Sequence, residues 1–121
     1  MGIISNIKLA IETRRKTNRV HIILNQVMED FDRDFYDCNS LAGIVEEKLS
    51  AADIPCSRII IRNAENNELG HKFYKNQMRH EVIEVFGRIF DPYSPRLMKL
   101  EAYLTDTYHQ PNKLEVKVMQ N

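Results

Sequence analysis

The chain has 121 residues with no formal net charge, 43% hydrophobic and 28% charged residues, and no apolar run near the roughly 20 residues needed to cross a bilayer. This length and composition exclude two full-sized domains, a disordered chain and a membrane-spanning chain. We therefore expect a single domain over residues 1–121, in the cytoplasm and without a membrane partner. Cys38 and Cys56 lie eighteen positions apart, which is typical of neither a disulfide framework nor a zinc or redox pair.

The zero net charge hides an uneven distribution along the chain. Residues 1–19 contain five basic residues and one acidic residue, residues 20–60 contain three and eight, and residues 61–121 contain nine and eight. The net charges of these three segments are +4, −5 and +1. The overall balance does not favour a general nucleic-acid binder, but it leaves room for a basic patch near the N-terminus.

The first third of the chain has the apolar spacing of helices. One amphipathic helix is predicted from residue 3 to about residue 17, and a second from residue 20 to about residue 35, with Asn18 as the stop of the first or the cap of the second. A strand over residues 20–25 stays open, because that stretch is short and β-branched. The apolar residues at helical spacing are Ile4, Ile7, Ile11, Val20, Leu24, Val27, Phe31 and Phe35.

A third helix and a strand are predicted next. Asn39 or Ser40 is a plausible helix cap, and the segment closes at Pro55. The inward-facing residues of this helix are Leu41, Ile44, Val45 and Leu49. SRIIIRN, residues 57–63, is short and β-branched enough to be a buried strand, and residues 63–68 read as a turn.

The second half of the chain changes from a helical to an alternating pattern. A long helix is predicted over about residues 67–90 from one apolar face formed by Tyr74, Met78, Val82, Val85 and Ile89. Pro92 and Pro95 end it. A C-terminal hairpin over about residues 97–105 and 113–119 follows, since LEVKV alternates cleanly, with Leu114, Val116 and Val118 on one face. The expected class is α+β: a helical N-terminal half and one long helix packed on a small sheet that contains strand 57–63 and this hairpin.

EDFDRDFYDCN, residues 29–39, has the acidic spacing of a calcium loop. Asp30, Asp32 and Asp34 match the first, third and fifth ligand positions of an EF-hand. The sixth position needs a turn-forming Gly and holds Phe35, and the twelfth needs a bidentate Glu and holds Leu41. We therefore expect no metal site here, and a helix that turns its phenyl rings inward and its carboxylates to solvent.

Two charged surfaces are the candidate binding sites. Asp30, Asp34 and Asp37 form the expected acidic face, which would dock a basic partner protein. The alternative site is the basic segment within residues 13–19, which could bind phosphates of a nucleic acid by releasing counterions. Its residues are Arg14, Arg15, Lys16 and Arg19.

No catalytic constellation is evident in the sequence. His80 and Glu84 stand in HEVIE, which lacks the second histidine of the zinc-protease motif, so both are expected on a solvated helix face. His71 is expected to be a partly buried core histidine. Both cysteines are expected to be buried thiols, because neither can be matched to a histidine. No glycine-rich phosphate loop is present, and we predict no catalytic residue and no cofactor.

The favoured function is a small protein–protein interaction module, a regulator, inhibitor or accessory factor, that presents charged helical faces to another protein or to a copy of itself. A nucleic-acid-binding accessory protein is the alternative. An enzyme with a site assembled from distant residues is the third and least favoured class. A helix-turn-helix over residues 40–63 is set aside, because three consecutive isoleucines cannot read base edges.

Overall fold

The computed structural model describes the backbone of residues 3–31 and 37–119, and the side chains of residues 14–31, 37–93 and 96–119. It confirms the α+β class. The helices are α1 (Ile3–Asp30), α2 (Cys38–Ala51) and α3 (Leu100–Thr107), and a single 3-10 turn spans Pro111–Lys113. The strands are β1 (Ser57–Asn63), β2 (Arg79–Val85), β3 (Arg88–Asp91), β4 (Ser94–Met98) and β5 (Leu114–Met119). None of the described helices is both long enough and apolar enough to span a membrane.

The strands form one antiparallel sheet in the order β4-β3-β2-β1-β5. β1 occupies the predicted residues and lies between β2 and β5, so that Ile59 faces Val82 on one side and Val118 on the other. Three consecutive isoleucines suit this position, since a strand with partners on both sides favours β-branched side chains.

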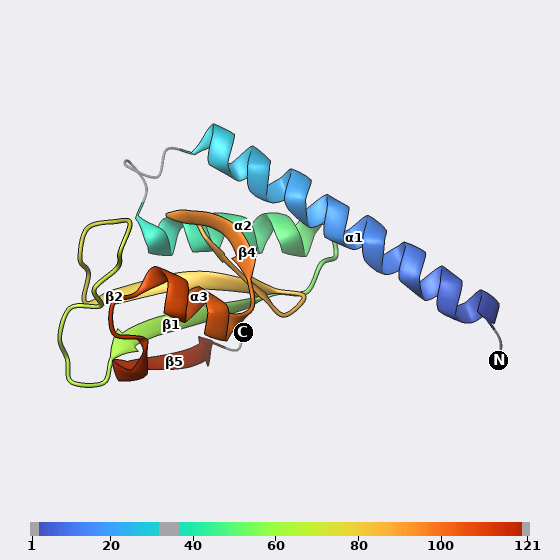
Figure 1. Ribbon diagram of the computed structural model, residues 1–121. Coiled ribbons are helices and arrows are strands. Elements are labelled where there is room, and N and C mark those ends of the chain that lie inside the picture. The colour runs from blue at the N-terminus through green and yellow to red at the C-terminus, as the bar shows by residue number, and fades with distance from the viewer. Residues whose placement is uncertain (1–2, 32–36, 120–121) are drawn as a thin grey trace.

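Two apolar clusters cover opposite faces of the sheet (Figure 1). The first joins α1 and α2 to the strands, and the second joins α3 and its following turn to them. The first includes Val20, Leu24, Val27, Leu41, Val45, Leu49, Ile83, Val85 and Phe90. The second includes Ile59, Ile61, Leu69, Val82, Ile89, Tyr103 and Tyr108. The sheet is therefore covered by helices on both faces.

Residues 3–30 form one continuous helix, so the predicted break at Asn18 is wrong, as is the strand alternative for residues 20–25. An exposed Asn costs a helix only a fraction of a kcal/mol, about 0.7 at most relative to Ala. Burial of Val20 and Val27 against α2 holds the helix beyond that point. The basic residues 14–19 consequently lie in the middle of α1 and not at a helix end.

The predicted helix over residues 67–90 is absent, and its second half is the hairpin of β2 and β3. Val85 pairs with Arg88, and the two residues between them, Phe86 and Gly87, have φ angles of 50° and 74°. Both values suit a tight two-residue hairpin turn. The helical spacing was misleading because this sheet is covered on both faces, so Val82 and Ile83 are both buried and the strand does not alternate.

The predicted C-terminal hairpin is also wrong in its first strand. Residues 100–107 form α3, in which Tyr103 and Thr107 lie one turn apart and are buried. β5 matches the predicted strand, but it pairs with β1 instead of with residues 97–105. Burial of Tyr103 and Thr107 on one face stabilises a helix here more than the moderate alternation of LMKLEAYL would stabilise a strand.

Candidate functional site

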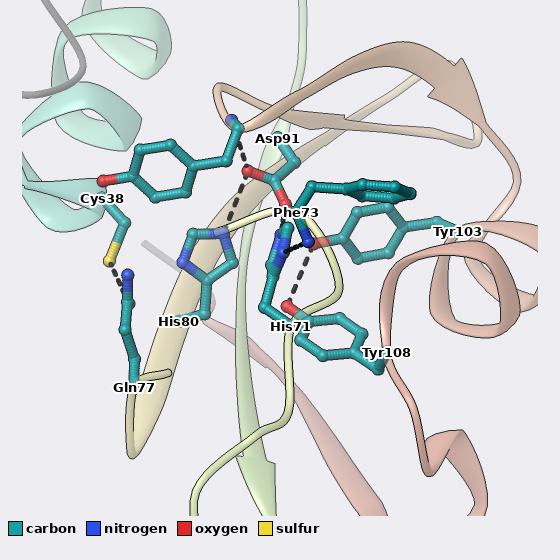
Figure 2. A network of polar contacts seen from close by, with 9 residues as sticks. Cys38, His71, Phe73, Gln77, His80, Asp91, Tyr103 and Tyr108 are labelled. Carbon is teal, nitrogen blue, oxygen red and sulfur yellow. Dashed lines mark hydrogen bonds and ion pairs between the residues drawn. The ribbon is translucent and has the colours of Figure 1, made fainter. Parts of the chain in front are cut away.

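The N-terminus of α2 meets β2 and β3 at a buried cluster of polar side chains (Figure 2). Cys38 is the first residue of α2, His80 is the second residue of β2, and Asp91 is the last residue of β3. His80 lies between the thiol of Cys38 and the carboxylate of Asp91. These three residues come from distant parts of the sequence and form the candidate site.

Asp37 fixes the position of Cys38 by capping α2. Its carboxylate accepts a hydrogen bond of 2.7 Å from the backbone N–H of Ser40, and that bond is the main cause of the lowered pKa of Asp37. The predicted caps, Asn39 and Ser40, lie inside the helix instead. Since a cap satisfies only one of the free N–H groups of the first turn, the helix end at Cys38 keeps a positive electrostatic potential.

His80 and Asp91 form a buried pair. Nε2 of His80 lies 3.0 Å from Oδ1 of Asp91, and the two residues are only 1% and 0% exposed. Burial, the largest single influence, lowers the pKa of His80, but the charge of Asp91 and the interactions with both neighbours outweigh it and raise that pKa to about 9. The raised pKa therefore favours the protonated imidazole at neutral pH.

Asp91 is surrounded by donors. Its Oδ1 accepts the backbone N–H of Tyr93 at 2.9 Å, and its Oδ2 accepts the hydroxyl of Tyr103 at 2.6 Å. The hydroxyl of Tyr108 lies 3.1 Å from that of Tyr103 and continues the network. Burial alone would raise the pKa of Asp91, but the charge of His80 and the side-chain interactions of His71, His80 and Tyr103 hold it below its ordinary value. Asp91 is thus a fixed, ionised carboxylate.

His71 is a second histidine on the same carboxylate. Its Nε2 lies 3.4 Å from Oδ2 of Asp91, and its Nδ1 accepts the backbone N–H of Phe73 at 3.0 Å. A neutral His71 therefore carries its proton on Nε2, facing Asp91. The side chain is 5% exposed, which confirms the expected partly buried histidine.

The thiol of Cys38 faces the other side of the His80 ring. Neither ring nitrogen of His80 has a partner in hydrogen-bond geometry among the described residues: Nε2 contacts Asp91 as an ion pair, and the other nitrogen points toward Cys38 (Figure 2). Burial raises the pKa of the Cys38 thiol, but the adjacent imidazole and its charge, with the backbone N–H of Glu81, lower it overall. By contrast, burial and Glu46 raise the pKa of Cys56.

Aromatic rings and one amide cover the site. The ring of Tyr93 stacks on His80 at 5.4 Å between centroids, and Tyr74 stacks on Tyr93 at 3.6 Å. The thiol of Cys38 donates a long hydrogen bond of 3.8 Å to Oε1 of Gln77. Tyr93, which follows β3, therefore covers one face of the imidazole, and the segment before β2 covers Tyr93 and brings an amide to the sulfur.

His71, His80 and Asp91 could also be read as a metal site, because one ligand atom from each lies within 4.8 Å of the others. Both oxygens of Asp91 already accept short hydrogen bonds, and the remaining nitrogen of His80 points at a thiol. A cation would have to displace those donors. The arrangement fits a hydrogen-bonded network that orients His80 better than a metal centre.

The structure separates the charged residues that the sequence selected. Asp30 is exposed at the end of α1, Asp37 caps α2, and Asp34 lies outside the described residues, as does Phe35. Phe31 is half-buried against the core, as predicted. Asp37 therefore belongs to a different helix from Asp30. The basic residues Arg14, Arg15, Lys16 and Arg19 are all exposed on α1.

His80 is the clearest correction, since it is a buried strand residue and not a solvated helical one. Cys38 and Cys56 are free and half-buried, not fully buried. Sequence reasoning missed Asp91 and Gln77 entirely. Some signals were available in the sequence. Cys38 directly follows a helix-capping Asp, His80 begins a β-branched run, and Asp91 ends the apolar run that follows.

Comparison of the chain with models of known protein families, with curated proteins and with solved structures yields no match.

Proposed function

We propose that the protein is a thiol-dependent acyl-transfer enzyme, most simply a hydrolase of an amide or ester. One observation carries the proposal: His80 lies between the Cys38 thiol, at the start of α2, and the buried Asp91 carboxylate. A nucleophile next to a base that a third group orients is the arrangement of nucleophilic catalysis. Such an arrangement is recognised by geometry and roles, on any fold.

Each residue has a distinct role in the proposed reaction. The raised pKa of His80 favours a resting pair in which Nδ1 already holds the proton of the Cys38 thiol, and Sγ of Cys38 attacks the substrate carbonyl carbon to form a C–S bond. His80 then returns the proton to the leaving amine or alcohol as its bond to the acyl carbon breaks. Water, activated by His80, hydrolyses the thioester and restores the thiol. Asp91 keeps the imidazole oriented and stabilises its positive charge.

Two groups could stabilise the negative oxygen that forms during attack. The backbone N–H of Cys38 is at a helix N-terminus, where N–H groups have no helical acceptor. The Gln77 amide contacts the sulfur, and a half-turn of this amide presents its N–H₂ group instead of its oxygen. Donors of this kind contribute about 100- to 1000-fold to rate in known enzymes.

The test is formation of an acyl-enzyme with an activated ester such as p-nitrophenyl acetate. We expect a burst of p-nitrophenolate and one acetyl group on Cys38, located by peptide mass spectrometry. Cys38→Ser should abolish both, and Asp91→Asn should slow the burst at least tenfold, because the imidazole loses its orienting charge. Cys56→Ser is the matched control and should behave as wild type. Equal acetylation of both thiols, or a burst that survives Cys38→Ser, would contradict the proposal.

A second proposal is the alternative drawn from the sequence, a nucleic-acid-binding accessory protein. The exposure of all four basic residues on α1 favours it. Retention on heparin that falls steeply with salt, and is lost when these residues are replaced by Gln, would support it. The acidic docking face is weakened, because Asp37 is used as a helix cap.

A further inference from the structure

The outer edge of β5 has no strand partner in the described part of the chain. β5 is the last strand of the sheet order and pairs only with β1. An edge strand leaves a row of backbone N–H and C=O groups free, and natural proteins usually protect it with a proline, a bulge or charged side chains, of which β5 has Glu115 and Lys117. β5 has no proline, and its end exposes Val118 (49%) and Met119 (37%).

The opposite edge of the sheet is protected in the usual way. β4 contains Pro95, and its pairing with β3 is irregular between Ile89 and Asp91. Both features oppose the addition of another strand. Of the two edges, β5 is therefore the one open to pairing.

The sequence of β5 is complementary to itself in one antiparallel register. If Val116 lies opposite Val116 of a second copy, Glu115 lies opposite Lys117 of the copy, and the two-fold axis repeats that pair. On the other face, Leu114 lies opposite Val118. The apolar row then continues the row of β1, where Ile61 and Ile59 face Val116 and Val118.

The neighbouring registers are unfavourable. Shifting the pairing so that residue 115 lies opposite residue 115 sets Glu against Glu. The opposite shift, centred on residue 117, sets Lys against Lys. Like charges directly opposite each other destabilise an antiparallel pair, so the charges of β5 select a single register.

We propose that β5 pairs antiparallel with β5 of a second copy, centred on Val116, so that one sheet continues through a two-fold dimer. The inference does not depend on the proposed enzymatic activity. β1 separates β5 from β2, so the strand pairing leaves the Cys38 site of each copy uncovered by the joined edge.

The test reverses the charges one at a time and measures association by sedimentation velocity over a range of concentrations. Wild type should show a concentration-dependent dimer. Lys117→Glu and Glu115→Lys should each raise the dimer dissociation constant about tenfold or more, because both ion pairs become like-charge pairs. An equimolar mixture of the two variants should form a heterodimer, since each new pair is then Lys against Glu. The double variant E115K/K117E should dimerise as wild type does.

Circular dichroism of each variant checks the fold. Lys117→Glu is the cleaner change, because Lys117 faces Ile60 within the chain, whereas Glu115 faces Arg62. A wild-type protein that stays monomeric at millimolar concentration would overturn the proposal. So would a dimer that tolerates both single reversals, or a mixture that associates no better than its components.

Discussion

The two cysteines differ in environment more than in exposure. Both are half-buried and free, yet the pKa of Cys38 is lowered by His80 and that of Cys56 is raised by burial and Glu46. Since the thiolate is the reactive form, the two thiols should differ in rate at neutral pH.

We predict that iodoacetamide alkylates Cys38 about tenfold faster than Cys56 at pH 7, from the opposite directions of their pKa shifts. Peptide mass spectrometry over a time course measures the two rates within one sample. His80→Gln should remove most of the difference, because it removes the imidazole beside the thiol. Faster labelling of Cys56 in the wild type would contradict the assignment of Cys38 as nucleophile.

The pair of His80 and Asp91 also predicts how stability depends on pH. The pKa of His80 is raised from 6.5 to about 9, so its stabilisation is complete below pH 6.5 and is lost as the pH rises through about 9. The pKa of Asp91 is lowered, so its contribution is present above about pH 4 and is lost in acid.

In a Cys38→Ser background, which removes the thiol titration, the free energy of unfolding should fall by about 2 kcal/mol between pH 6.5 and 9. Urea denaturation at several pH values measures this. Adding Asp91→Asn should flatten the slope, because the imidazole then has no carboxylate to pair with. A stability that rises over this interval would show that the imidazole is neutral in the folded protein.

At the scale of elements, α2 places the Cys38 thiol and Asp37 determines where α2 begins. Asp37→Ala should lower the free energy of unfolding by about 1 kcal/mol, the usual cost of losing a helix cap. Asp37→Asn is the matched control, since its side-chain oxygen also accepts the N–H of Ser40. Thermal or urea unfolding compares the two. Equal losses in both variants would assign the effect to charge and not to capping.

The sequence predicts elements well where one signal dominates. Residues 57–63 were identified as a strand because three β-branched residues stand between arginines, and the buried face of α2 followed from Leu41, Val45 and Leu49. The helix predicted over about residues 67–90 is wrong because a sheet covered on both faces buries consecutive residues and imitates a helical period. The Phe-Gly turn was the missed local signal.

The site itself was out of reach of such patterns. Cys38, His80 and Asp91 meet because α2 packs on β2 and because β2 pairs with β3 in one register. Neither fact is encoded in the spacing of the residues along the chain. The helical spacing predicts that His80 faces solvent, where it would meet neither thiol.

At the scale of the whole molecule, the charged helix and the candidate site occupy different regions. The site lies where α2, β2 and β3 meet, whereas the exposed basic residues lie on α1 before its packed half. The basic residues of α1 and the Cys38 site can therefore be substituted separately. Variants at β5 and at Cys38 should have additive effects, since they share no contact within the described side chains.

Among the side chains of α1 that the structure describes, residues 14–30, the first core residue is Val20, and Arg14, Arg15, Lys16 and Arg19 are exposed just before it. Brief trypsin digestion of the native protein should therefore trim the chain within this basic stretch and leave a resistant fragment that starts at or shortly before Val20. That trimmed protein should keep the fast alkylation of Cys38, because every side chain of the site lies downstream of the cut. The reactivity of Cys38 would then be independent of the residues removed by the cut.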